Sequence, residues 1–127
     1  MRGVTLDTGA LLAADRNDRS LWALIGQWSA RGVDVVVPAG CIAQAWRDGA
    51  RQALLARLLA GCDVDDLTGP VARELGLVLA ASQTSDVIDA HVVFGAWRRG
   101  DVVVTSDPGD ITALAESSGG RIAIHHV

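Results

Sequence analysis

The sequence predicts an α/β fold in which helices cover both faces of a central parallel sheet. Strand-like and helix-like segments alternate along the chain, which is the pattern of parallel strands joined by crossover helices. The run Val-Val-Val occurs twice, at 35–37 and 102–104, and continuous apolar strands of this kind suit a sheet that is buried on both sides. The 127 residues fit a single domain over 1–127, and an apolar content of 50% argues against disorder.

The first elements are a strand, a helix and a second strand. Val4–Leu6 is a short apolar run that ends at an acidic residue. Leu21–Ala30 places its large apolar side chains on one helical face, with Ser20 in the N-cap position. Val33–Val37 is a β-branched run closed by a proline, which predicts a strand.

The middle of the chain predicts three helices and one weak strand. Gly40–Asp48 and Arg51–Leu59 have helical patterns and are separated by a glycine. Cys62–Leu67 is the weakest of the predicted strands. Pro70–Ala81 starts with proline at a first helical position, behind Thr68, which favours a helix.

The last part predicts a long helix followed by strand, helix and strand. Asp86–Arg99 is expected to be helical with Ser85 as its N-cap, and Val102–Thr105 is a strand of the buried type. Ile111–Glu116 is a short helix, and Arg121–His125 is the last strand. The complete order is βααβααβααβαβ, or close to it.

The composition excludes several kinds of chemistry. All of the 11 basic residues are arginines, so neither a lysine Schiff base nor a P-loop is possible. There is no G-x-G-x-x-G, and the two cysteines, Cys41 and Cys62, form neither a C-x-x-C nor a disulfide framework. No apolar run has transmembrane length and no secretory signal is present, so we expect a cytoplasmic protein without a membrane partner.

Acidic residues follow two predicted strands at their carboxyl ends. Asp7 comes directly after the first strand, and Asp107 follows Val102–Thr105 by two residues. Carboxyl ends of parallel strands form the ligand-binding edge of such sheets. Asp86 and Asp89 are three residues apart at the start of a helix and share a face, and Asp110 could start the last helix. For Asp86 and Asp110, helix capping and a functional role remain equal alternatives.

Several carboxylates that converge on one edge repel one another unless a cation lies between them. Mg²⁺ prefers oxygen ligands and commonly binds one or two carboxylates while keeping several waters. Such an ion activates water and neutralises charge on a phosphodiester. The formal net charge of −4 by itself argues against binding nucleic acid, but a bound divalent cation would reverse the local sign.

Three segments resemble the motifs of PIN-domain nucleases, in matching order and spacing: VTLDTGAL at 4–11, DAHVV at 89–93 and VVTSD at 103–107. Length and element order resemble the VapC-type toxins of bacterial toxin–antitoxin pairs. The resemblance implies a three-layer α/β/α sandwich with a parallel sheet. It also implies an endoribonuclease that hydrolyses RNA with Mg²⁺ or Mn²⁺, a homodimer, and a cognate antitoxin protein that neutralises the enzyme.

The resemblance assigns roles to individual residues. Asp7, Asp89 and Asp107 would hold the metal ion, directly or through water, and Asp86 would assist them in catalysis. Thr8 and Thr105 match hydroxyl residues that hydrogen-bond a carboxylate or water, and Asp110 is the nearest substitute for Asp107. Arg16 and Arg19, in the loop after the first motif, are candidates for an RNA-binding rim.

One position departs from the family pattern. The family has a glutamate in the helix after the second strand, and here Gln44 occupies that place. Glutamine offers an amide oxygen but removes a negative charge, so metal affinity should fall. Asp48, one turn further along the predicted helix, or Asp86 would restore the charge, and Asp86 is the better candidate because it belongs to a matching segment.

Two other functions remain open. Gln44 also favours a degenerate PIN domain that binds RNA or a partner protein without efficient cleavage. Alternatively, Asp7 could accept a phosphoryl group, because receiver domains and haloacid-dehalogenase-type phosphatases resemble this layout. Both of those families normally rely on a lysine, which this chain lacks, and the phosphatases also want an acid where Gly9 stands.

Overall fold

Five parallel strands form one sheet in the computed structural model, which describes residues 3–127. The strands lie in the order β3-β2-β1-β4-β5, and every neighbouring pair is parallel. Their bounds are β1 (Gly3–Leu6), β2 (Asp34–Pro38), β3 (Asp63–Asp65), β4 (Val102–Thr105) and β5 (Ala123–His126). The predicted parallel sheet is therefore confirmed, and each predicted strand overlaps an observed one.

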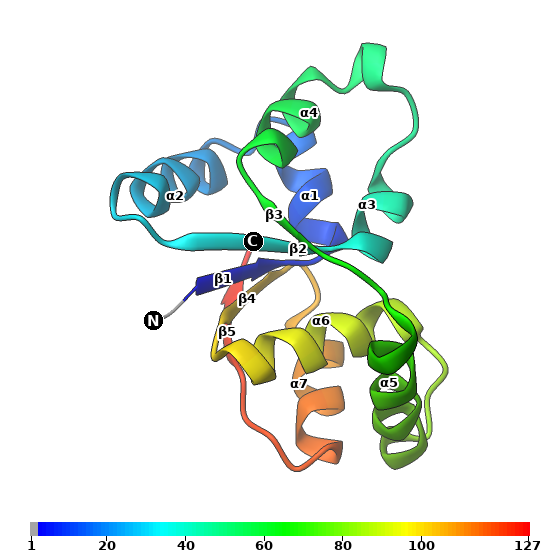
Figure 1. Cartoon of the computed structure of the whole chain (residues 1–127). Coiled ribbons are helices and arrows are strands. Elements are labelled where there is room, and N and C mark those ends of the chain that lie inside the picture. Colours follow the sequence, from blue (N-terminus) through cyan, green and yellow to red (C-terminus); the bar gives the residue numbers. More distant parts are fainter. Residues whose placement is uncertain (1–2) are drawn as a thin grey trace.

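Helices cover both faces of this sheet. The first four, α1 (Thr8–Asp15), α2 (Arg19–Ala30), α3 (Ala39–Ala45) and α4 (Ala53–Ala60), lie on one face, together with the short 3-10 turn η1 (Gly49–Arg51) (Figure 1). The other face carries α5 (Gly69–Ser82), α6 (Val87–Arg99) and α7 (Pro108–Ser117). This is the three-layer α/β/α arrangement expected from the sequence. Over residues 3–127, no helix combines the length and the apolar character needed to cross a membrane.

The direction of winding reverses between β1 and β4. From β1 the chain moves outward through β2 to β3, then returns across α5 and α6 to place β4 on the other side of β1. Thr5 pairs with Val103 and Leu6 with Val104, so the two strands end at the same level. A crevice forms outside the carboxyl ends of parallel strands at such a reversal. The residues that follow β1 and β4 meet there.

A polar network beneath α6 ties this helix to the sheet. Arg99 donates from Nη1 to Asp65 Oδ2 at 2.6 Å and from Nε to Asp101 Oδ2 at 2.9 Å. The buried Thr5 hydroxyl donates to the same Asp101 oxygen at 2.8 Å. His91, only 2% exposed, places Nε2 3.4 Å from Asp65 Oδ2. These contacts join α6 to β1, to β3 and to the residue before β4, which sets the position of the helix over the sheet.

Two helices begin with a different capping residue from the one predicted. The Asp18 carboxylate caps α2 by accepting from the Leu21 N–H at 3.0 Å, where Ser20 was expected. Asp86 caps α6 in place of Ser85. Both aspartates accept as charged carboxylates, which interact more strongly than a hydroxyl with the N–H groups and the positive end of the helix. Thr68, which stands before the predicted proline start, is the N-cap of α5.

The helix predicted over Gly40–Asp48 stops three residues early, at Ala45. The buried Gln52 side chain causes this, because its Oε1 accepts from the backbone N–H groups of Arg47 at 2.7 Å and Asp48 at 2.9 Å. Asp48 then caps η1 through the Ala50 N–H. Asp48 therefore does not lie on the helix that carries Gln44, so its predicted place one turn further along that helix is wrong, and its role in restoring the missing charge stays a prediction.

Candidate active site

Asp7 occupies the junction of β1 and α1. It is 7% exposed, and its Oδ1 accepts from the Ala10 N–H at 2.9 Å, so it is the N-cap of α1. Burial raises the pKa of the Asp7 carboxyl above its ordinary value, against the opposing hydrogen bonds from the Thr105 hydroxyl and the Ala10 amide. The Asp107 charge adds to the increase. This carboxylate is thus costly to keep ionised unless a cation approaches it.

Asp86 and Asp89 meet at the start of α6. Asp86 Oδ1 accepts from the Asp89 N–H at 2.9 Å, so Asp86 does act as a cap. Asp89 is half-buried in the first turn, and its pKa is raised to about 6. Burial is the largest cause, followed by the neighbouring Asp86, and the charges of Asp7 and Asp110 raise the pKa further. Four carboxylates are therefore close enough to influence one another's ionisation.

Asp107 and Asp110 complete this group from the β4 side. The buried Thr105 hydroxyl accepts from the Asp107 N–H at 2.9 Å and so shapes the turn that leads into α7. The Asp107 carboxylate is exposed and does not cap its helix. Hydrogen bonding with the Asp107 carboxyl, and the Asp107 charge, raise the pKa of Asp110. Asp107 remains available to a ligand, while Asp110 lies in the first turn of α7.

A polar cavity of about 340 Å³ opens beside these acids. Asp86, Asp89 and Asp110 line it, together with hydroxyl and small side chains: Ser82, Thr84, Ala113, Leu114 and Ser117. The structure thus brings together all five acids named from the sequence at the predicted edge of the sheet. Their grouping follows from the winding reversal, because three separate chain segments reach this edge.

The donor set suits a hard divalent cation bound through few carboxylates. Mg²⁺ usually takes one or two carboxylates and fills its octahedral shell with water, and the mutually repelling Asp7 and Asp89 fit that requirement. Within residues 3–127, no three His, Cys, Asp or Glu side chains are arranged to hold a metal ion together. The roles of Asp7, Asp89 and Asp107 as a set of metal ligands therefore stay a prediction.

Gln44 lies beside the acids and is already hydrogen-bonded. The Thr8 hydroxyl donates to Gln44 Oε1 at 2.5 Å, which joins α3 to the start of α1. One turn before Gln44, Cys41 is buried, and burial together with the Asp7 and Asp89 charges raises the pKa of its thiol to about 12. Cys41 is thus an unreactive thiol. The contact places Gln44 next to Thr8, the residue that follows Asp7, with the Gln44 amide oxygen accepting from the Thr8 hydroxyl.

The two predicted rim arginines lie farther from the acids. Arg16 follows the last turn of α1, about 12 Å along the helix axis from its start at the acidic group, and Arg19 begins α2. Both are exposed, and neither lines the cavity beside the acids. Their contribution to RNA binding remains a prediction.

Gly9 and Ser106 are site residues that the sequence interpretation missed. A Cβ atom on Gly9 would overlap the Ser106 hydroxyl, so the turns after β1 and β4 approach this closely only because residue 9 has no side chain. The sequence feature that could have indicated this contact is the glycine itself, because glycine in a helix lowers stability by about 1 kcal/mol relative to alanine. The contact holds the two acid-bearing turns side by side.

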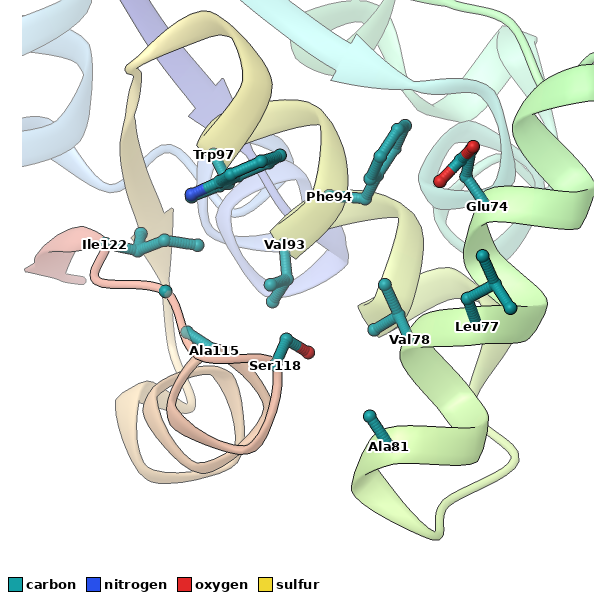
Figure 2. Close-up of a pocket in the computed structure, with 11 residues that line it drawn as sticks. Glu74, Leu77, Val78, Ala81, Val93, Phe94, Trp97, Ala115, Ser118 and Ile122 are labelled. Carbon is teal, nitrogen blue, oxygen red and sulfur yellow. The ribbon is translucent and has the colours of Figure 1, made fainter.

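A second cavity, of about 220 Å³, lies among α5, α6 and α7 and is mainly apolar. In Figure 2, Phe94 and Trp97 extend from α6, Leu77 and Val78 from α5, and Ile122 from the segment after α7. None of the five acids lines it. Its walls offer no set of charges for phosphate chemistry, so the acidic edge is the better candidate for an active site.

Comparisons with known proteins agree on the fold. A scan against protein-family models gives no match, and a search of curated proteins gives none. Among solved structures, FitAB bound to an IR36 DNA fragment matches with a TM-score of 0.66 and 17% identity, covering 97% of this chain and 94% of the other. VapBC2 from Rickettsia felis, bound to a DNA fragment from its promoter, matches with a TM-score of 0.66 and 13% identity, covering 98% of both chains. The likeness supports a PIN-like fold over almost the whole chain.

Proposed function

We propose that this chain is the toxin of a toxin–antitoxin pair, a metal-dependent endoribonuclease that hydrolyses RNA phosphodiesters. One observation carries the proposal: the segments that resemble PIN motifs bring Asp7, Asp89 and Asp107 to one edge of the sheet, where the winding reverses and Asp86 and Asp110 join them. Acids with raised pKa values in a shared cleft are typical of functional sites. A buried carboxylate such as that of Asp7 is normally paired with a cation or hydrogen-bonded.

Mg²⁺ or Mn²⁺ is the cofactor in this proposal. Asp7 and Asp89 would hold the ion, with Asp107 binding directly or through water, and Asp86 would assist. When bound, the ion would supply an activated water and neutralise charge on the phosphodiester. The chain itself contributes rigid placement: Asp7 is fixed by the Ala10 amide, and the Asp89 backbone by the Asp86 carboxylate.

The proposed partners are RNA as substrate, a cognate antitoxin protein and a second copy of the chain. The FitAB and VapBC2 structures are complexes bound to DNA, and the shared fold supports an antitoxin partner by analogy. An inhibitory segment that enters the acidic cleft would need positive charge, and an arginine provides bidentate contacts to carboxylates. Co-expression with the products of the neighbouring reading frames, followed by affinity purification, tests this partnership.

Cleavage of RNA tests the enzymatic part. Purified protein is incubated with RNA and Mn²⁺, and Asp7→Asn and chelator-treated protein serve as the critical comparisons. We expect cleavage only by the metal-loaded wild type. Undiminished cleavage by Asp7→Asn, or after metal removal, would exclude this site as the source of the activity. Asp15→Asn, at the far end of α1, provides a matched control that should cleave normally.

A degenerate PIN domain that binds RNA without efficient cleavage is the second candidate. The Thr8–Gln44 hydrogen bond favours it, because it uses one of the two lone pairs of the only oxygen through which Gln44 could bind a metal ion. Gln44→Glu discriminates the two, since it restores a carboxylate at this place. A large gain in cleavage would favour the degenerate domain, whereas cleavage already present and not increased would favour a complete site.

A further inference from the structure

We propose that Gln44 donates a hydrogen bond from its amide nitrogen to a phosphate oxygen of the bound RNA strand, and that it is not a metal ligand. This rests on the proposed ribonuclease function and assigns a substrate-binding role within that site. In this assignment Gln44, which stands where the family has a glutamate, contributes to RNA binding instead of only weakening metal binding.

The hydrogen bond from Thr8 determines which end of the amide is available. Thr8 Oγ1 lies 2.5 Å from Gln44 Oε1, a short donor–acceptor distance for a hydroxyl hydrogen bond. The Thr8 hydrogen bond uses one of the two lone pairs of this oxygen, and the other polar group of the side chain is the NH₂, which only donates. Among residues 3–127 this nitrogen has no hydrogen-bond partner, and Gln44 is exposed. A solvent-accessible donor without a partner in the described part of the chain is therefore present next to Thr8, the residue that follows Asp7.

The charge around the site supports the same orientation of the amide. Gln44 lies one helical turn after Cys41, whose thiol is close enough to Asp7 and Asp89 for their charges to raise its pKa. Carboxylates attract the NH₂ end of an amide and repel its oxygen. Turning the amide over would place its NH₂ group against the Thr8 hydroxyl and lose the Thr8 contact in its present form. The NH₂ group cannot bind a cation, so in this arrangement Gln44 offers a metal ion only the second lone pair of an oxygen that already accepts from Thr8.

A phosphate oxygen is the partner that this donor suits. The five acids around the cleft have no donors in their side chains when ionised, and the predicted rim arginines lie beyond the far end of α1. A strand that enters the cleft therefore depends on neutral donors, which include the hydroxyl groups of the cavity lining, such as that of Thr84, and the amide of Gln44. Neutral amide side chains commonly bind backbone phosphate oxygens and position the strand without reading its sequence.

Parallel measurements of RNA binding and metal binding test the proposal. Affinity for a short fluorescent single-stranded RNA of mixed sequence is measured by anisotropy, with Ca²⁺ replacing Mg²⁺ and the integrity of the strand checked on a gel. Mn²⁺ affinity without RNA is measured by calorimetry. Gln44→Met keeps the length of the side chain and removes the donor, and Gln27→Met, at an exposed position on α2, is the matched control.

We expect Gln44→Met to weaken RNA binding about tenfold while leaving Mn²⁺ affinity unchanged, as expected for one hydrogen bond to a charged group. Gln44→Glu should also weaken RNA binding but tighten Mn²⁺ binding, because it exchanges a donor for a charge. Gln27→Met should change neither affinity.

Two results would overturn the assignment while leaving the ribonuclease proposal standing. One is RNA binding by Gln44→Met equal to that of the wild type, and the other is a loss of Mn²⁺ affinity as large as that caused by Asp89→Asn. If the wild type neither binds nor cleaves RNA, both the ribonuclease proposal and the role of Gln44 are refuted together.

Discussion

Arg99 Nη1 lies 2.6 Å from Asp65 Oδ2, and this ion pair joins the last turn of α6 to the edge strand β3. The same guanidinium contacts Asp101 through Nε at 2.9 Å, so one arginine neutralises two acids that are largely buried. Gly95 makes the approach possible, since a Cβ atom there would lie 2.6 Å from the Asp65 carboxylate. The arrangement fixes α6, the helix that presents Asp86 and Asp89, against three parts of the sheet.

Removing this arginine should destabilise the fold strongly. Arg99→Met leaves Asp65 and Asp101 close together without a counter-charge, and breaking a buried ion pair from one side costs about 3–5 kcal/mol. Urea denaturation measures the change in the free energy of unfolding. Arg73→Met, at an exposed position on α5, is the control and should cost less than about 0.5 kcal/mol. Equal stability of the two variants would contradict the proposed role of the network.

The contact between Gly9 and Ser106 predicts a rescue. Gly9→Ala should lower stability by about 1–3 kcal/mol, because the added methyl group overlaps the Ser106 side chain and forces the two turns apart. Ser106→Gly removes the obstacle, so the double variant should recover most of the loss. A double-mutant cycle in urea measures the coupling.

Gly26→Ala, in the interior of α2, is the control for this cycle. No atom lies within 4 Å of a Cβ atom placed there, so the substitution should stabilise the helix by about 0.5–1 kcal/mol. Independent, additive effects of Gly9→Ala and Ser106→Gly would refute the steric explanation.

Asp89 predicts how the stability of the metal-free protein depends on pH. Its pKa is raised from 3.8 to about 6 by burial and by neighbouring acids, so the folded state favours the protonated form. The stabilisation from this group is fully present below about pH 4 and is lost as pH rises through about 6. Thermal melts in chelator should therefore give a wild-type midpoint that falls over this range, with a smaller fall for Asp89→Asn. Parallel pH profiles for the two proteins would contradict the assignment.

Metal binding should reverse this trend. A divalent cation requires ionised carboxylates, so Mn²⁺ should raise the melting temperature more near neutral pH than near pH 5, where Asp89 is protonated. Differential scanning fluorimetry with and without Mn²⁺ measures the shift. Asp7→Asn should reduce the shift at neutral pH, whereas Asp34→Asn, an exposed aspartate at the start of β2, should leave it intact. A shift that is the same at both pH values would place the ion elsewhere.

Local patterns predicted the elements well, because each depends on residues close in sequence. Val102–Thr105 has the predicted bounds, and the other elements with predicted ranges differ by one to three residues at one or both ends, whereas no range was predicted for α1. The early end of α3 arose from a side chain outside the predicted helix. Gln52 captures the N–H groups that would have extended α3, which no periodicity within Gly40–Asp48 could reveal. At the starts of α2 and α6, an aspartate occupies the capping position for which a serine was predicted.

The sequence alone determined the fold class and the types of residue at the carboxyl ends of the strands, because alternating periodicities and strand-end acids are visible in the order of residues. The tertiary structure decided which of these groups interact. The strand order places β4 beside β1, and this brings acids separated by about one hundred positions in the chain into one electrostatic group. It also decided the role available to Gln44, since the hydroxyl that engages its oxygen lies 36 residues away in the chain. Contacts of this kind depend on how the chain winds around the sheet, and no local pattern encodes them.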